Sequence, residues 1–151
     1  MNLVEKLIDN NLTISAAESL TGGLFQATVV SIAGASKVFL GGIVSYTKEA
    51  KCKLLGLKMA EIEKNGVYSN ETSLSMAYGV KELTGSNIAV GISGVAGPGA
   101  DEGVPAGTVY YSIVFNEVVY NRKIEIPNQH RQMVREKTVE VIIDDLQKLL
   151  K

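Results

Sequence analysis

Cysteine, histidine and tryptophan are nearly absent from this sequence of 151 residues, which has one cysteine, one histidine and no tryptophan. The single cysteine, Cys52, excludes an internal disulfide bond and agrees with a reducing compartment. No setting of basic residues with a histidine surrounds it, so we expect a small buried hydrophobic group rather than a reactive thiol. One histidine, one cysteine and scattered carboxylates show no ligand spacing, so we expect neither a metal ion nor another cofactor.

Aromatic residues and net charge are also scarce. Phe, Trp and Tyr make up 6% of the chain, and 15 basic residues against 16 acidic ones leave a formal net charge of −1. A general nucleic-acid binder needs many cations to neutralise phosphates and aromatic rings on which bases stack. The composition therefore argues against a nucleic-acid partner and favours a small molecule.

No apolar run in the sequence is long enough to span a membrane. The first residues, MNLVEKLIDNN, include Glu5 and Asp9 and lack the basic-then-apolar layout of a signal peptide. We therefore expect a cytoplasmic protein with no membrane partner. The length suits a single domain over residues 1–151 with one good-sized core.

Hydrophobic spacing predicts helices and strands that alternate along most of the chain. Helices are predicted over about 3–10, from 21, and over 47–56, 69–85 and about 130–150. Strands are predicted over 12–18, 39–46, 87–93, 108–115 and 118–126. The third strand is apolar throughout, which favours the centre of the sheet, and the last two form an antiparallel hairpin across Asn116-Glu117. This order predicts an α/β fold, a three-layer α/β/α sandwich on a mixed, mostly parallel sheet with a late antiparallel hairpin.

A first candidate site, AAESLTGGLF, follows the first predicted strand. Ser19 stands at the carboxyl end of that strand, where open α/β sheets place ligands. A serine hydroxyl becomes a nucleophile once a neighbouring base takes its proton. The amides of Thr21, Gly22 and Gly23 would lie at a helix N-terminus, where they can stabilise an oxyanion or a phosphate. The alternative is a turn with a helix cap.

A base for Ser19 can be sought among histidine and lysine. His130 lies beside Arg131 at the start of the last helix; a Ser-His-Asp triad is compatible with the composition, but nothing in the spacing supports it. The segment SYTKEAK follows the second strand and brings Tyr46 and Lys51 to the same sheet edge. A lysine serves as a base when burial or a cationic neighbour lowers its pKa. The alternative is a solvated charged helix, to which we assign Lys48, Lys53 and Lys58.

A third candidate is the glycine-rich loop GISGVAGPGADEGVPAGT. Ser93 and Gly94 follow a buried strand, and the glycines at Gly97 and Gly99 let the backbone approach a ligand closely. The loop has no Gly-Lys-Ser/Thr of a Walker motif, and it is not a dinucleotide fingerprint. A long glycine loop in a small domain is usually functional or mobile, and we favour a functional loop.

Four segments together resemble the CinA C-terminal domain family, the nicotinamide-nucleotide amidases also called PncC: AAESLTGG, GGIVSYTKEAKCKLLG, GISGVAGPGADEGVPAGTVY and RQMVREKT. The resemblance runs in order over about 13–138. It implies a three-layer α/β/α sandwich with a mixed sheet. It also implies hydrolysis of the carboxamide of nicotinamide mononucleotide to nicotinate mononucleotide and ammonia, a step of pyridine nucleotide salvage.

Carried over by position, the resemblance places the family's nucleophile on Ser19 and its partners on Tyr46 and Lys51. Larger two-domain members have an additional N-terminal domain with pyrophosphatase activity, which this sequence lacks, so we expect that reaction to be absent. This chain also departs from the family at 129–131, where Gln-His-Arg replaces the Gly-Asp-Arg of many relatives. We therefore expect the loop before the last helix to sit differently.

These residues together predict an acyl-enzyme mechanism. Lys51, held neutral by its surroundings, takes the proton of Ser19, whose oxygen attacks the carboxamide carbon. Tyr46 hydrogen-bonds within this pair and relays a proton to the leaving ammonia. The amides of turn 21–23 receive the oxyanion.

The phosphate of a mononucleotide must be met by helix N-termini or by cations. Loop 93–99 offers amides and a hydroxyl but no cation, and Asp101 and Glu102 would repel a phosphate unless the loop turns them outward. Arg131 and Arg135 are four residues apart, so we expect one cationic patch for the phosphate on a shared helix face. The alternative is a solvated pair at the helix start.

Two other functions stay open. A nucleotide-binding module without chemistry would use the same glycine loops for phosphate, and Tyr46 and Lys51 would then be ordinary surface residues. A structural partner in DNA uptake or repair is suggested by the family's association with competence or damage-inducible genes, although the near-neutral charge gives it no support. We also expect a homo-oligomer, with a dimer favoured.

Overall fold

The computed structural model describes residues 1–150, which form five strands and six α-helices. The strands are β1 (Ile14–Glu18), β2 (Phe39–Val44), β3 (Ile88–Gly94), β4 (Thr108–Phe115) and β5 (Val118–Glu125). The helices are α1 (Leu3–Asp9), α2 (Leu24–Val30), α3 (Lys48–Leu55), α4 (Met59–Asn65), α5 (Asn70–Thr84) and α6 (Arg131–Leu149). A short 3-10 helix, η1 (Ala35–Lys37), leads into β2.

The five strands form one sheet in the order β2-β1-β3-β4-β5. β1 pairs in parallel with β2 and β3, whereas β4 pairs antiparallel with β3 and β5. Only β4 therefore runs against the other four strands, which confirms the mixed, mostly parallel sheet and the late hairpin. All residues of β3 are buried, as expected for its central position.

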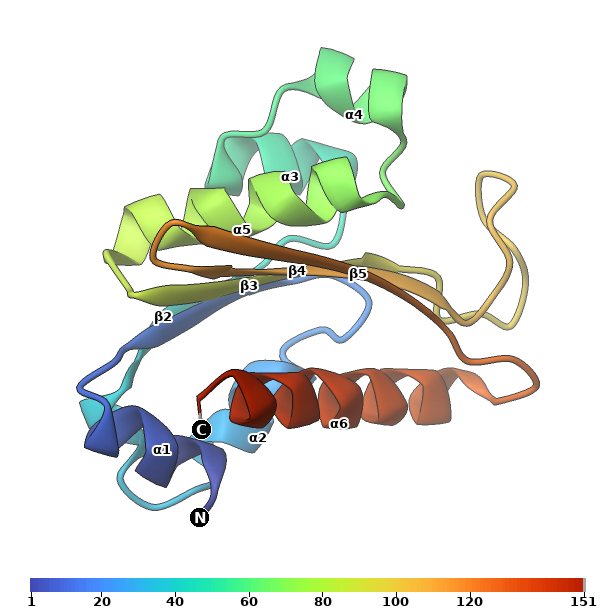
Figure 1. Cartoon of the computed structure of the whole chain (residues 1–151). Coiled ribbons are helices and arrows are strands. Elements are labelled where there is room, and N and C mark those ends of the chain that lie inside the picture. The colour runs from blue at the N-terminus through green and yellow to red at the C-terminus, as the bar shows by residue number, and fades with distance from the viewer. Residues whose placement is uncertain (151) are drawn as a thin grey trace.

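Helices cover both faces of the sheet, which confirms the three layers (Figure 1). One face carries α1, α2 and α6, and the other carries α3, α4 and α5. Alternating side chains of β3 enter the two cores: Ile88, Val90 and Ile92 join the first, and Ala89 joins the second. This period of two explains why β3 has to be apolar throughout.

Two helices differ from the sequence prediction. α2 begins at Leu24 rather than at 21, because Gly22 and Gly23 take positive φ angles of 57° and 102° and form a turn. α4 was not predicted, and its N-cap, Lys58, makes no side-chain capping bond that would mark its start. α5 agrees with its prediction: the Ser69 hydroxyl accepts from the Thr72 amide at its start, and Gly85 ends it.

The carboxyl ends of β1, β2 and β3 meet at one edge of the sheet, because these three strands are parallel. Loop 95–107 and the start of α6 lie at the same end of the sheet (Figure 1). Residues far apart in the sequence are thereby gathered where open α/β sheets bind ligands. Over residues 1–150, no helix has both the length and the apolar character needed to cross a bilayer.

Candidate functional site

Ser19 and Lys51 are in direct contact at the carboxyl edge of the sheet. The Lys51 ammonium nitrogen Nζ lies 3.0 Å from Ser19 Oγ and donates to the carbonyl oxygen of Ser45 at 2.8 Å. Ser19 follows β1, and Lys51 lies in the first turn of α3, which the Thr47 hydroxyl caps by accepting from the Ala50 amide. The cap fixes the start of α3 and with it the direction of the Lys51 side chain.

Burial lowers the pKa of Lys51 from its usual 10.5 to about 8. The side chain is only 1% exposed, and no carboxylate pairs with it in the described part of the chain. A fraction of Lys51 is therefore neutral near pH 7, and most of it is neutral above pH 8. A neutral amine at hydrogen-bond distance from a serine hydroxyl can accept its proton.

The turn after Ser19 is held by its own backbone and by Glu18. The Gly22 amide donates to the Ser19 carbonyl at 2.9 Å, and the buried Glu18 carboxylate accepts from the amides of Phe25 and Gln26 at 2.9 Å each. The start of α2 thus already holds an anion, and Gly22 is not free to receive an oxyanion as predicted. The amides of Thr21 and Gly23 have no hydrogen-bond partner within residues 1–150.

Arg135 braces this turn from α6. Its Nε donates to the Leu20 carbonyl at 2.9 Å and its Nη2 to the Thr21 carbonyl at 2.8 Å, while Nη1 donates to Gln132. These bonds use all three nitrogens of the guanidinium on the turn and on its own helix. The predicted single cationic patch of Arg131 and Arg135 is therefore wrong, because Arg135 faces the Leu20–Thr21 carbonyls.

Arg131 instead bonds Tyr46 across the site. Its Nη2 donates to the Tyr46 hydroxyl, and its Nη1 donates to the Gly97 carbonyl at 2.6 Å. The predicted hydrogen bond of Tyr46 within the Ser19–Lys51 pair is absent, because the adjacent Ser45 carbonyl takes that place beside Lys51. At the start of α6, His130 is the N-cap and accepts through Nδ1 from the Met133 amide. Aspartate is one of the residues that commonly cap helices in this way.

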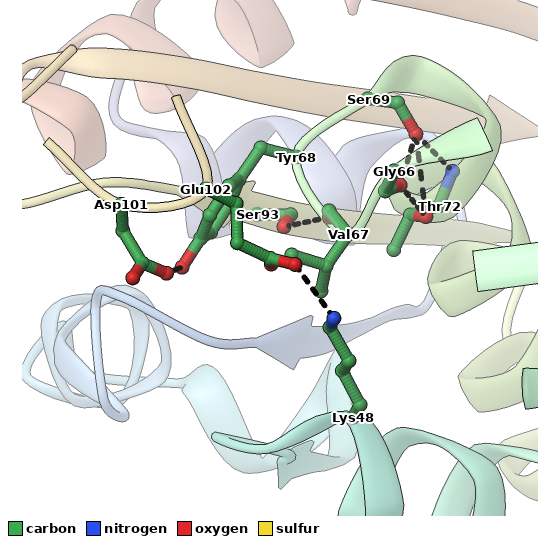
Figure 2. A network of polar contacts seen from close by, with 9 residues as sticks. All are labelled: Lys48, Gly66, Val67, Tyr68, Ser69, Thr72, Ser93, Asp101 and Glu102. Carbon is green, nitrogen blue, oxygen red and sulfur yellow. Dashed lines mark hydrogen bonds and ion pairs between the residues drawn. The ribbon is translucent and has the colours of Figure 1, made fainter. Parts of the chain in front are cut away.

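Loop 95–107 follows β3 at this edge of the sheet, and its acidic residues Asp101 and Glu102 have partners on other elements (Figure 2). The Tyr68 hydroxyl donates to the Asp101 carboxylate, and the Lys48 ammonium pairs with Glu102 at 2.7 Å. Ser93 is fully buried, and its hydroxyl donates to the Val67 carbonyl at 2.7 Å. This hydroxyl holds the segment before α5, and the contact of Ser93 with a ligand stays a prediction.

These elements enclose a cavity of about 400 Å³. Among the predicted site residues, six line it: Ser19, Tyr46, Lys51, Gly94, Gly97 and Arg131. The remaining predicted residues do not: Thr21, Gly22, Gly23, Ser93 and Arg135. Asp101 and Glu102 line the cavity rather than turning away from it.

Lys48 and Tyr68 also line the cavity but were not predicted as site residues. The Lys48 side chain is 32% exposed, in agreement with the solvated charged helix expected for it, and it also pairs with Glu102 at the cavity. Its position three residues before Lys51 could have indicated a shared face. Tyr68 precedes α5 in a segment without a local signal, so only the packing of α5 on the sheet brings it here. Cys52, the other expectation near Lys51, is half-buried against the second core.

The polar side chains of the site determine which ligands it can hold. No group of three or more His, Cys, Asp or Glu side chains within residues 1–150 is arranged to hold a metal ion. The polar groups that line the cavity are a hydroxyl, amines, a guanidinium, phenols and two carboxylates. These groups can position and transfer protons and can bind an anion through Arg131.

A family model described as CinA C-terminal domain matches residues 1–150 of this chain. A protein from Limosilactobacillus fermentum named competence-damage inducible protein is 44% identical over 139 residues, which are 91% of this chain and 34% of that protein. A protein of the same name from Streptococcus equi subsp. zooepidemicus is 46% identical over 131 residues, 87% of this chain and 31% of that protein. The chain spans about a third of the length of these relatives.

Solved structures share the fold. A competence-damaged protein (CinA) superfamily protein from Klebsiella pneumoniae superposes with a TM-score of 0.95 at 28% identity, covering 98% of this chain and 92% of that one. A competence/damage inducible protein from Agrobacterium tumefaciens gives a TM-score of 0.90 at 32% identity, covering 99% and 94%. The family match, the relatives and the fold agree with the resemblance seen in the sequence, and this chain belongs to the CinA C-terminal domain family.

Proposed function

We propose that this chain is an amidohydrolase that converts nicotinamide mononucleotide to nicotinate mononucleotide and ammonia, with Ser19 as nucleophile and Lys51 as base. The observation that carries the proposal is the buried contact of 3.0 Å between Lys51 Nζ and Ser19 Oγ on the wall of a cavity. A lysine with its pKa lowered to about 8 and a serine as its neighbour form an activated nucleophile.

The reaction needs two proton transfers through Lys51 in each half. Neutral Lys51 takes the Ser19 proton as Oγ bonds to the carboxamide carbon, and it returns that proton to the nitrogen as the carbon–nitrogen bond breaks and ammonia leaves. In the second half, Lys51 takes a proton from water as the water oxygen attacks the ester, and returns it to Ser19 Oγ. The sum is one water consumed and one ammonia released, with the enzyme unchanged.

The developing oxyanion needs donors beside Ser19. We assign this role to the amides of Thr21 and Gly23, which lie in the turn after Ser19 and have no hydrogen-bond partner within residues 1–150, whereas Gly22 is bonded to the Ser19 carbonyl. Neither residue lines the cavity itself, so the substrate carbonyl has to enter the turn to reach them. Arg135 would act as a positioning residue, because it fixes the carbonyls of Leu20 and Thr21 and so the direction of the adjoining amides. One well-placed donor contributes roughly 3–4 kcal/mol to such a transition state.

The phosphate of the substrate requires a cation in the same cavity. Arg131 lines the cavity and makes its hydrogen bonds to two uncharged oxygens, those of Tyr46 and Gly97, so its charge is available to an anion. A cavity of about 400 Å³ is of the size that holds a small ligand. Tyr46, which is 54% exposed, orients Arg131 in this scheme rather than relaying a proton.

The test compares ammonia release with binding. The chain is incubated with nicotinamide mononucleotide, ammonia is measured by a coupled enzyme assay, and affinity for the same ligand is measured by calorimetry. We expect both binding and ammonia release. Binding without ammonia would contradict the amidase and support a nucleotide-binding module, although the burial of Lys51 already differs from the surface position that such a module assumes.

A further inference from the structure

The two acidic side chains of loop 95–107 differ in how their charges are balanced (Figure 2). Glu102 pairs with the Lys48 ammonium at 2.7 Å, so its charge is compensated. Asp101 accepts from the Tyr68 hydroxyl, a neutral donor, and forms no ion pair within residues 1–150. Asp101 is therefore the carboxylate on the cavity wall that has no ion-pair partner among residues 1–150, although the Lys48 ammonium also feels its charge.

Tyr68 remains a neutral donor over the whole physiological range. Burial and the neighbouring Asp101 carboxylate raise the pKa of its hydroxyl well above the usual range. The hydrogen bond fixes the phenol ring beside the carboxylate, and both side chains line the cavity. An aromatic ring next to an unpaired carboxylate is an environment that attracts a cation.

A positive charge without an anionic partner lies on another wall of the same cavity. Arg131 comes from the start of α6 and bonds only to the uncharged oxygens of Tyr46 and Gly97. In the described part of the chain, the cavity thus presents one carboxylate without an ion-pair partner, Asp101 on the loop, and two cations without one: Arg131 at the start of α6 and, below pH 8, Lys51 beside Ser19. This arrangement is complementary to a ligand that carries a cation and an anion at separate positions.

We propose that Asp101 and Tyr68 form a subsite for a permanently positive ring, and that this subsite makes the enzyme prefer N-alkylated nicotinamides to free nicotinamide. The proposal rests on the proposed function and names the determinant of its substrate class. A nicotinamide ring is positively charged only when its ring nitrogen carries a substituent such as ribose. The substituted ring nitrogen neither donates nor accepts a hydrogen bond, and the carboxamide is the same in both rings, so charge and aromatic contact are the means by which a protein distinguishes the charged ring from the neutral one.

The test uses ligands that differ in ring charge and lack both ribose and phosphate. Ser19→Ala protein, which leaves the carboxamide intact, is titrated with 1-methylnicotinamide, a cation, and with nicotinamide, which is neutral. Each titration is repeated with Asp101→Asn, which keeps an acceptor for the Tyr68 hydroxyl and removes the charge. The matched control is Glu117→Gln, which removes the same charge from the exposed turn at the opposite end of β4.

We expect 1-methylnicotinamide to bind about fivefold more tightly than nicotinamide, as for one charge pair at close range near water. Asp101→Asn should abolish this preference by weakening the binding of 1-methylnicotinamide without changing that of nicotinamide. Glu117→Gln should leave the preference unchanged. High salt should narrow the preference in the parent protein, because the attraction is screened.

Two results would overturn the subsite: an unchanged preference in Asp101→Asn, or an equal loss for the cation and the neutral ring, which would indicate a structural role. The outcome is separable from that of the proposed function. Cation preference without ammonia release would refute the amidase alone. Ammonia release from the mononucleotide without a cation preference would refute the subsite alone.

Discussion

The Lys51 ammonium lies between the Ser19 hydroxyl and the Ser45 carbonyl, and burial lowers its pKa to about 8. If neutral Lys51 is the base, kcat/KM for nicotinamide mononucleotide should rise about tenfold per pH unit below pH 8 and level off above it, because the neutral fraction follows that course. The measurement is a pH profile between pH 6 and 10 in buffers of constant ionic strength. A rate that falls as the pH rises through 8 would contradict the assignment.

The same burial affects stability at the residue scale. The pKa of Lys51 is lower in the folded chain than in the unfolded one, so burying the cation costs stability fully below pH 8 and progressively less as the pH rises towards 10.5. Lys51→Met should therefore abolish turnover and raise the free energy of unfolding at pH 7 by about 1–3 kcal/mol. This gain already allows for the hydrogen bond from Lys51 that the Ser45 carbonyl loses in the variant. Urea denaturation at pH 7 and pH 10 measures the gain, which should be smaller at pH 10. An equal change at both pH values would contradict this account.

Single residues were predictable where chain position alone decides their place. Ser19 and Lys51 each follow a parallel strand, and carboxyl ends of parallel strands meet, so their contact follows from the order of elements. The partners of Ser93 and Arg135 were not predictable. Several carbonyls and carboxylates compete for each such donor. Only the packed structure shows that Ser93 donates to the Val67 carbonyl and Arg135 to the Leu20 carbonyl.

At the scale of elements, β3 and α5 are in close contact at Gly91. A Cβ atom added there would lie 2.0 Å from the Ser73 carbonyl oxygen of α5, so Gly91→Ala should push the helix from the sheet and destabilise the fold by about 3 kcal/mol. The control is Gly85→Ala at the end of α5, where φ is +73° and nothing lies within 4 Å, at a cost of about 1 kcal/mol. Chemical denaturation compares the two, and equal costs would contradict tight packing at Gly91.

Element types were predictable because periodicity reports burial. β3 is apolar at every position since helices cover both of its faces, and this pattern is visible in the sequence. α4 was missed because it is short and has no side-chain cap, so its formation depends on tertiary contacts such as that of the buried Ile62 with the second core. The late start of α2 depends on Gly22 and Gly23, which take positive φ angles in the structure. Glycine is compatible with a helix or a turn, so the sequence alone does not decide between them.

At the scale of the whole molecule, the sheet order brings β1, β2, β3, loop 95–107 and the start of α6 to one end (Figure 1). The near-neutral composition gave no indication that opposite charges are separated within one cavity, because a sum of charges carries no position. The three-layer fold, in contrast, was predictable from the order of helices and strands. Fold and family membership do not by themselves give the reaction, which rests on the geometry of one site.

That geometry is tested most directly by measuring ammonia release from nicotinamide mononucleotide by the Ser19→Ala protein. The matched control is Ser36→Ala, which removes an exposed hydroxyl in η1. Circular dichroism first establishes that both variants are folded. Loss of a nucleophile removes covalent catalysis, so Ser19→Ala should lower kcat by about 10³-fold or more, while Ser36→Ala retains the parent rate. A Ser19→Ala protein that still releases ammonia at the parent rate would contradict the serine mechanism.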